Sequence, residues 1–192
     1  MAVFAKNCPN IEFEVVDINE DRINAWNNND LAKLPVFEPG LSEIIKVVRG
    51  RNLFFSTNIN HSIKKADMVF ISVNTPIKKT GIGAGETSDL RWVESCARLI
   101  GEVAENHTIV VEKSTLPVRT AQTIKDILLS SNSTLKNKSF SVLSNPEFLA
   151  EGTAIRDLEQ PDRVLIGGDD KEAMDSLNDI YLNWIPQNKL IF

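Results

Sequence analysis

The residues whose types and spacing best fit chemistry lie in the stretch 144–168, SNPEFLAEGTAIRDLEQPDRVLIGG. Two carboxylates, Glu147 and Glu151, stand four residues apart around the apolar triplet 148–150. A carboxyl group can take up or release a proton, and apolar neighbours that desolvate it raise its pKa toward neutral pH. The stretch therefore predicts a general acid or base, and an ordinary acidic turn is the alternative.

The position of this stretch in the chain supports the chemical interpretation. It follows an apolar run at 140–143 that is typical of a buried parallel strand. Pro146 keeps Asn145 extended, and together with Gly152 it makes a regular helix over 147–151 unlikely to form. Loops at the carboxyl ends of such strands are where open α/β sheets bind ligands.

Two other strand exits carry polar groups of the same kind. Residues 73–76 (VNTP) and 112–115 (EKST) each follow a buried strand. Because the carboxyl ends of parallel strands meet at one edge of a sheet, we expect both exits to converge with 145–151 on one crevice. Each exit alone is a weak signal, since loops after strands are often rich in Asn, Ser and Thr.

Asp17 closes another predicted strand, residues 11–17 (IEFEVVD). In dinucleotide-binding folds an acid at this place accepts hydrogen bonds from the ribose hydroxyls, and its charge disfavours the 2′-phosphate of NADP. A plain turn is the alternative. Arg22, one helical turn further on, faces either the same ribose or solvent.

The glycine-rich loop that normally accompanies such an acid is not found before it. Sixteen residues precede Asp17, and the first glycine of the chain is Gly40. The segment 81–85 (GIGAG) has the wrong spacing and follows a polar stretch, so it predicts a loop. His61 and His107 have no partners at ligand spacing, and no metal site is predicted.

Strand and helix patterns alternate along the chain. Strands are predicted at 11–17, 53–56, 68–73, 108–112, 140–143 and 164–166. Helices are predicted at 1–8, 20–26 with Asn19 as N-cap, 41–48 after a turn at 35–40, 59–66, 90–100, 117–128 and 173–182. Polar connectors are predicted at 78–88 and 130–139. This alternation predicts an α/β fold with a doubly wound parallel sheet.

Composition narrows the class of protein. The chain has 192 residues, 42% hydrophobic and 24% charged, as in ordinary globular domains. A net charge of -5, without a basic run, argues against a nucleic-acid partner. No apolar stretch is long enough to span a bilayer, and no signal peptide is recognised. Cys8 and Cys96 form no CxxC motif, which suits a reducing compartment. We therefore expect a cytoplasmic protein.

Seven segments resemble one enzyme family in order along the chain. They are RINAWN (22–27), FEPGL (37–41), NLFFSTN (52–58), VFISVNTP (69–76), VEKSTLPVRT (111–120), SNPEFLAEGTAIRDL (144–158) and PDRVLIGG (161–168). Together they are similar to the UDP-glucose 6-dehydrogenases, particularly the eukaryotic type. The resemblance covers the first part of such an enzyme, and neither cysteine matches the family's GFGGSC segment.

The resemblance implies a fold that is incomplete. It implies a Rossmann-like NAD-binding domain over 1–192, with the sheet core and active-site loop at 1–168 and a closing helix and tail at 169–192. In the strand order 3-2-1-4-5-6, strand 1 and its glycine-rich loop would be missing, between 11–16 and 68–73. The family's central helix and carboxyl-terminal UDP-sugar domain would also lie outside the chain.

The resemblance also assigns roles to individual residues. Glu147 would be the acid/base group, and Thr115 would position a catalytic water. The cofactor NAD would be bound by Asp17, Arg22, Val73, Asn74, Thr75, Pro76, Ile77, Ser114, Thr115, Leu116 and Glu151. The UDP-sugar would be bound by Glu147, Phe148, Leu149, Ala150 and Glu151.

The activity that the resemblance implies is the oxidation of UDP-glucose at C6. Two NAD-dependent oxidations, the second through a Cys thioester, would give UDP-glucuronate in a homo-oligomeric enzyme. The 192 residues alone would be inactive because the nucleophilic Cys is not among them. Three alternatives stay open: a related dehydrogenase of a mannose or N-acetylhexosamine nucleotide, a non-catalytic chain that joins full-length subunits, and the product of a truncated gene model.

Overall fold

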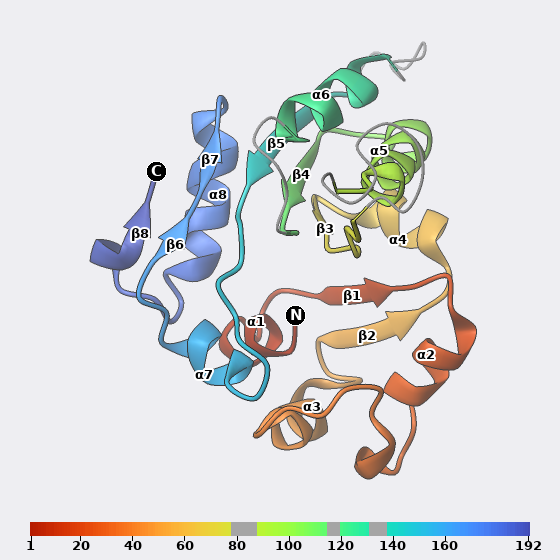
Figure 1. Cartoon of the computed structure of the whole chain (residues 1–192), viewed down its shortest axis with the longest axis vertical. Helices are drawn as coiled ribbons and strands as arrows, with labels where there is room; N and C mark the ends of the chain where they lie inside the picture. Colours follow the sequence, from red (N-terminus) through yellow and green to blue (C-terminus); the bar gives the residue numbers. More distant parts are fainter. Residues whose placement is uncertain (78–87, 115–119, 131–137) are drawn as a thin grey trace. The chain divides into compact units, whose positions relative to one another are not determined.

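The computed structural model describes residues 1–77, 88–114, 120–130 and 138–192 (Figure 1). The chain forms two compact units. Unit 1 comprises Met1–Ser62, Phe148–Arg163 and Asn178–Leu190, and unit 2 comprises Ile63–Glu147, Val164–Leu177 and Ile191–Phe192. Each unit is described by itself. The predicted division into 1–168 and 169–192 stays a prediction.

Unit 1 is built on a pair of parallel strands, β1 (Phe13–Val16) and β2 (Leu53–Ser56), with Phe13 opposite Leu53. Its helices are α1 (Ala2–Asn7), α2 (Glu20–Trp26), α3 (Leu41–Val48) and α7 (Ala154–Glu159), with 3₁₀ turns η1 (Leu31–Lys33) and η2 (Gln187–Lys189). Helix α1 packs against α3 and α7. Within the same unit, α2 packs on β2.

Local sequence explains the ends of these elements. The Asn19 side chain accepts a hydrogen bond from the Arg22 amide at 3.0 Å, which caps α2 as predicted. Gly40 precedes α3 with φ of 85°, a left-handed conformation that glycine adopts without a steric cost. The buried Asn52 amide donates to the carbonyls of Ala5, Cys8 and Ile11 and so joins the end of α1 to the start of β2.

An aromatic cluster fills the core of unit 1. The Phe4 ring lies 5.2 Å from the Tyr181 ring and 5.0 Å from the Trp184 ring, both in edge-on geometry. Phe13 adds a further edge-on contact to Phe4 at 6.2 Å. Phe4 and Tyr181 are almost completely buried. Such pairs stabilise a core beyond the area they bury, by about 0.5–1.5 kcal/mol each.

Unit 2 is built on three parallel strands in the order β3 (Met68–Ile71), β4 (Thr108–Glu112) and β5 (Phe140–Ser144). A short fourth strand, β7 (Gly167–Gly168), runs antiparallel to β5. Helix α5 (Arg91–Val103) packs against α6 (Thr120–Ser130), and α6 packs on β5 (Figure 1). Val110, Val111 and Leu143 are fully buried, as expected for parallel strands covered by helices.

Three further elements complete the described chain. Helices α4 (Ile59–Lys65) and α8 (Lys171–Tyr181) each run through the division between the units. Strand β6 (Val164–Leu165) pairs with β8 (Leu190–Ile191). In unit 2 the Ile166 amide donates to the Ile191 carbonyl at 2.9 Å.

The predicted α/β class is confirmed, and the described strands follow the predicted neighbour order. β1 and β2 pair with each other, β3, β4 and β5 are consecutive neighbours, and the two sets form separate sheets. The sequence predicted a parallel sheet, and one strand departs from this, because β7 (Gly167–Gly168) pairs with β5 in the antiparallel direction. Three predicted segments lie outside the described residues. They are the polar connector at 78–88 except Ser88, the start of the predicted helix at 117–119, and residues 131–137 of the connector at 130–139.

Candidate active site

The exits of β3, β4 and β5 come together in unit 2. The Ser114 hydroxyl donates to the Val73 carbonyl at 3.0 Å, which links the β3 and β4 exits. The Asn145 amide donates to the Glu112 carbonyl at 2.8 Å, which links the β4 and β5 exits. The register explains this, since Glu112 lies opposite Ser144. The convergence that polar strand exits predicted is therefore present for these three segments.

Asn145 fixes the start of the loop that carries Glu147. Its side chain is fully buried and donates to the Leu165 carbonyl at 2.7 Å. The Lys113 ammonium reaches the Asn145 carbonyl at 3.3 Å. With the amide bonded to β4, the backbone and the side chain of Asn145 are all engaged, so the loop leaves β5 from a fixed point.

Two adjacent charged residues, Glu112 and Lys113, are buried at the end of β4. Burial raises the pKa of Glu112 to about 7, although the Lys113 charge opposes the shift. Burial also lowers the pKa of Lys113 to about 8, although the negative charges of Glu147 and then Glu112 oppose it. Among the described residues, the buried Glu112 Oε1 has no hydrogen-bond partner. Titratable groups with shifted pKa values gather at functional sites, and this pair adjoins the Glu147 loop.

No functional role was assigned to Glu112 and Lys113 from the sequence. A signal for the pair is visible there, since Glu112 and Lys113 directly follow the β-branched run 108–111. Charged residues are rarely buried without a partner. A charged pair at the end of a buried strand therefore indicates a candidate functional site.

The acidic loop itself is exposed. Glu147, Glu151 and the residues between them lie at the surface, with Phe148 53% and Leu149 37% accessible. The expectation that Phe148 and Leu149 desolvate one of the carboxylates is therefore wrong for this structure. Instead, the Arg163 guanidinium lies 5.3 Å from the Phe148 ring centre, a cation–π contact in unit 1.

The backbone after Glu151 turns sharply. Gly152 has φ of 83°, and helix α7 begins at Ala154. As predicted, no regular helix covers 147–151. The short helix that follows was not predicted, because six residues, three of them polar, show no clear helical period.

Asp17 follows β1 in unit 1 with its carboxylate held in place. One oxygen accepts from the Asn19 amide at 2.9 Å, and the other lies 3.4 Å from the Arg22 guanidinium. The Asp17 side chain remains 29% exposed. An oriented, accessible carboxylate after a parallel strand fits the ribose hydroxyls of a dinucleotide, so the residues present suit that part of NAD.

The other predicted site residues are placed as follows. Asn74, Pro76 and Ile77 are exposed, Val73 and Thr75 are half-buried, and Ile77 forms an antiparallel bridge with Ser88. Thr115 and Leu116 lie outside the described residues. No cluster of metal-ligating side chains occurs in the part of the chain that the structure describes. Within the same part, no helix has the length and apolar character needed to cross a membrane.

Comparison with known enzymes gives a consistent result. UDP-glucose 6-dehydrogenase 4 of Arabidopsis thaliana is 53% identical over 195 residues, a match that covers 100% of this chain and 39% of that enzyme. UDP-glucose 6-dehydrogenase of Bos taurus is also 53% identical, with 99% of this chain and 38% of the enzyme covered. The chain thus spans about two fifths of the length of these relatives.

Solved structures of related enzymes have the same fold. GDP-mannose dehydrogenase from Pseudomonas aeruginosa, solved as a ternary complex, superposes with a TM-score of 0.83 at 30% identity. That match covers 99% of this chain and 43% of the enzyme. A UDP-glucose dehydrogenase from the archaeon Pyrobaculum islandicum gives a TM-score of 0.80, with the same identity and coverage. The Rossmann-like α/β class is thereby confirmed.

The family model supports the predicted cofactor. Residues 1–185 match the model of the UDP-glucose/GDP-mannose dehydrogenase family, NAD binding domain. This match, the identity of about half to the eukaryotic enzymes, and the shared fold agree with one another. The chain belongs to the UDP-glucose/GDP-mannose dehydrogenase family and corresponds to its NAD binding domain.

Proposed function

We propose that this chain is the NAD-binding part of a dehydrogenase that oxidises the C6 alcohol of UDP-glucose to the carboxylate of UDP-glucuronate. The identity of 53% to plant and animal enzymes named UDP-glucose 6-dehydrogenase favours UDP-glucose as the substrate. We further propose that the complete enzyme is a cytoplasmic homo-oligomer. The observation that carries the proposal is the meeting of three polar strand exits at the base of the Glu147 loop.

Asp17 and Arg22 form the proposed ribose site. The Asp17 carboxylate is already oriented by the Asn19 amide and Arg22, so little side-chain freedom is lost when it binds hydroxyl groups. Its negative charge disfavours a 2′-phosphate, which accounts for the choice of NAD. NAD, when bound, supplies the acceptor for the hydride that leaves C6.

The segments 73–77 and 114–116, with Glu151, form the proposed lining of the rest of the cofactor site. The Ser114–Val73 hydrogen bond sets the spacing of the two segments at their start. Substrate contact is proposed for Phe148, Leu149, Ala150 and the two flanking acids. Their exposure leaves the loop accessible to a nucleotide sugar.

Glu147 is the proposed acid/base group. Its carboxylate is exposed at the surface, within electrostatic range of the Lys113 ammonium, and a carboxylate is a group that can accept a proton. In the last step it would take a proton from a water that Thr115 holds, and that water would attack a thioester formed on a Cys of the complete enzyme. The proton leaves water for Glu147, and the thiolate leaves the carbonyl carbon.

The test uses a completed enzyme, in which the 192 residues are joined to the segments of the Arabidopsis relative that lie outside the match. The variant Glu147→Gln removes the base and keeps the side-chain shape. We expect turnover to fall by about a hundredfold or more while the first oxidation continues. Intact-mass spectrometry should then detect a sugar-nucleotide acyl group on the Cys.

Glu172→Gln is the matched control, because Glu172 is an exposed acid on α8. This variant should turn over as the unchanged enzyme does. If Glu147→Gln also turned over normally, or was slow without acylation of the Cys, the proposed role of Glu147 would be wrong.

A further inference from the structure

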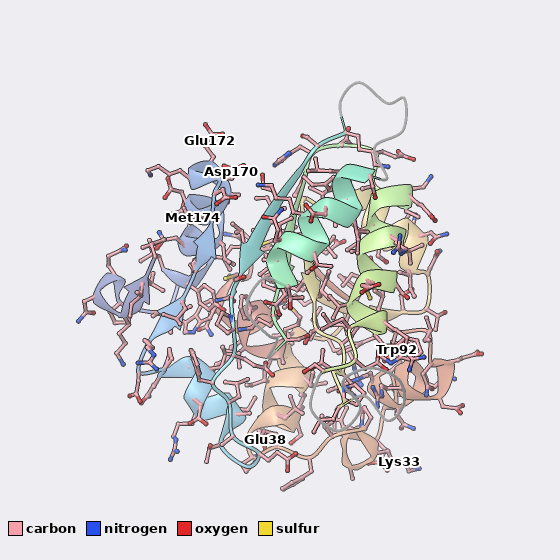
Figure 2. All side chains as sticks on the ribbon, turned by 45° about the horizontal axis from the view of Figure 1, so that its top comes forward. Lys33, Glu38, Trp92, Asp170, Glu172 and Met174 are labelled. Carbon is pink, nitrogen blue, oxygen red and sulfur yellow. The ribbon has the colours of Figure 1, made fainter. Side chains whose placement is uncertain are left out.

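A carboxylate from a distant turn contacts the backbone just after the proposed substrate loop. In unit 1, one oxygen of Glu38 accepts from the Gly152 amide at 3.0 Å. The other oxygen accepts from the Ala154 amide at 2.6 Å (Figure 2). The two partners are 114 and 116 residues from Glu38 in sequence. Hydrogen bonds to a charged acceptor are about twice as strong as neutral ones.

The backbone that Glu38 contacts has a need for such an acceptor. Gly152 is in the left-handed region, and Ala154 is the first residue of α7. The N-cap residue Thr153 makes no side-chain capping bond. Its hydroxyl instead bonds the carboxylate of Asp157 at 2.6 Å. Glu38 thus provides the acceptor that a local N-cap would normally provide.

The same short segment is also tied internally. The Asp157 carboxylate accepts from the Ala150 amide at 3.3 Å, and the Thr153 amide donates to the Ala150 carbonyl at 3.1 Å. Residues 150–157 are therefore linked to one another by hydrogen bonds. The hydrogen bonds that the amides of Gly152 and Ala154 donate to Glu38 consequently also restrict Glu151, which lies in the same turn.

Glu38 is itself held by rigid surroundings. It lies between Phe37 and Pro39 in the turn before α3, and its carbonyl accepts from the Leu41 amide at 3.0 Å. Helix α3 is anchored by Leu41, Ile44 and Ile45, which are buried. Pro39 restricts the turn further, because its ring fixes the backbone angle φ. The carboxylate is therefore presented from a fixed base.

We propose that Glu38 is a positioning residue, which holds the loop 148–151 in the geometry needed for substrate and cofactor contact. This inference rests on the proposed function of that loop. Glu38 acts through the amides of Gly152 and Ala154 and does not touch the reacting groups. The FEPGL segment would then contribute to catalysis from a distance of more than a hundred residues in sequence.

Hydrogen exchange tests the contact without any measurement of activity. In the completed enzyme, Glu38→Ala removes both acceptors, whereas Glu38→Gln keeps one oxygen. We expect the peptide covering 149–156 to exchange faster in Glu38→Ala, and to an intermediate extent in Glu38→Gln. Glu43→Gln is the control, because Glu43 is a surface acid of α3 whose carboxylate accepts a hydrogen bond from its neighbour Ser42. Unchanged exchange in Glu38→Ala would overturn the proposal.

Kinetics test the positioning role. Glu38→Ala should reduce kcat at least tenfold, with a smaller reduction in Glu38→Gln, because a misplaced loop affects the transition state more than ground-state binding. The KM for NAD should change less than kcat, since Asp17 and Arg22, the proposed ribose site, are untouched and only the Glu151 contact is displaced. Faster exchange at 149–156 with unchanged kcat would overturn the proposal. A failure of the proposed function would instead appear as normal turnover in Glu147→Gln.

Discussion

Both carboxylate oxygens of Asp17 have partners, and this makes a prediction about cofactor choice. The variant Asp17→Asn removes the charge that opposes a 2′-phosphate and keeps an acceptor for a ribose hydroxyl. In the completed enzyme we expect the ratio of kcat/KM for NAD to that for NADP to fall by about tenfold, roughly 1.4 kcal/mol.

Asp21→Asn is the control for this prediction, because Asp21 is an exposed acid in the first turn of α2. It removes one negative charge, as Asp17→Asn does, from a position four residues further along the chain. An unchanged NAD to NADP ratio in Asp17→Asn would remove Asp17 from the ribose site.

The buried pair at the end of β4 makes a prediction about pH. The pKa of Glu112 is raised from 4.5 to about 7, so the folded state retains a proton that the unfolded state has released. Stability from this group is fully present below pH 4.5 and is lost as the pH rises to about 7. In Glu112→Gln the melting temperature should fall less between pH 5 and about 7 than in the unchanged enzyme.

Lys113 acts at higher pH with the opposite slope. Its pKa is lowered from 10.5 to about 8, so its contribution is present above pH 10.5 and is lost as the pH falls to about 8. The control for Glu112→Gln is Glu102→Gln, because Glu102 is an exposed acid on α5. This control should leave the dependence of the melting temperature on pH unchanged. An identical profile for Glu112→Gln and the unchanged enzyme would contradict the role of burial.

At the residue scale the sequence revealed types but not surroundings. The Asn19 cap is confirmed because helix caps leave local signals, and the roles of Asp17 and Glu147 stay predictions drawn from their positions after strands. The links of Glu38 to Gly152 and of Lys113 to Asn145 were not identified. Each depends on tertiary contacts between segments far apart in sequence, and no local pattern encodes such a contact.

At the element scale, the close approach of β7 to β5 makes Gly168 necessary. A Cβ at Gly168 would lie 2.5 Å from Leu143 Cδ2, 3.3 Å from the Val142 carbonyl oxygen and 3.6 Å from Met174 Cγ (Figure 2 labels Met174). Leu143 is fully buried and has little room to move. We therefore expect Gly168→Ala to cost about 1–3 kcal/mol of stability.

Gly167 provides the matched control for this prediction. A Cβ there would come no closer than 3.8 Å to Ser144 Cβ, an ordinary contact. Thermal melts of the completed enzyme should show a lower midpoint for Gly168→Ala than for Gly167→Ala. Equal midpoints would mean that β7 moves away from β5 without cost.

Elements with a complete local pattern are predictable from the sequence, and elements without one are not. The bounds of α2, α3, β2 and β4 agree with the sequence prediction because their caps, apolar faces or β-branched runs are complete. Helix α7 and strands β7 and β8 have two to six residues each. Segments of this length are too short to show a helical or strand period, and their structure depends on the neighbours they pair with.

At the scale of the whole molecule, the described strands form separate sheets. β1 and β3 are each the end strand of their own sheet. In the 3-2-1-4-5-6 order, one strand lies between these two positions. Such edges promote aggregation when nothing pairs with them.

This arrangement makes a prediction about the 192 residues expressed by themselves. We expect poor solubility, and no heat of binding when millimolar NAD is added in calorimetry, because the sequence has no Gly-x-Gly-x-x-Gly segment for the pyrophosphate. Addition of the segments of the Arabidopsis relative that lie outside the match should give a monodisperse protein that binds NAD. A monodisperse, cooperatively melting monomer of the 192 residues alone would contradict the first part.

The aromatic cluster around Phe4 has a consequence for the order of folding during synthesis. Phe4 packs on Trp184, about 180 residues later in the chain. At a synthesis rate of about 5–20 residues per second, the first helix waits roughly 10–40 s before its partner leaves the ribosome. Contacts of this sequence separation also slow folding in free solution. During that interval the apolar face of α1 is exposed and can bind a chaperone. A ribosome stalled before Trp184 should carry a nascent chain in which Phe4 is still open to solvent.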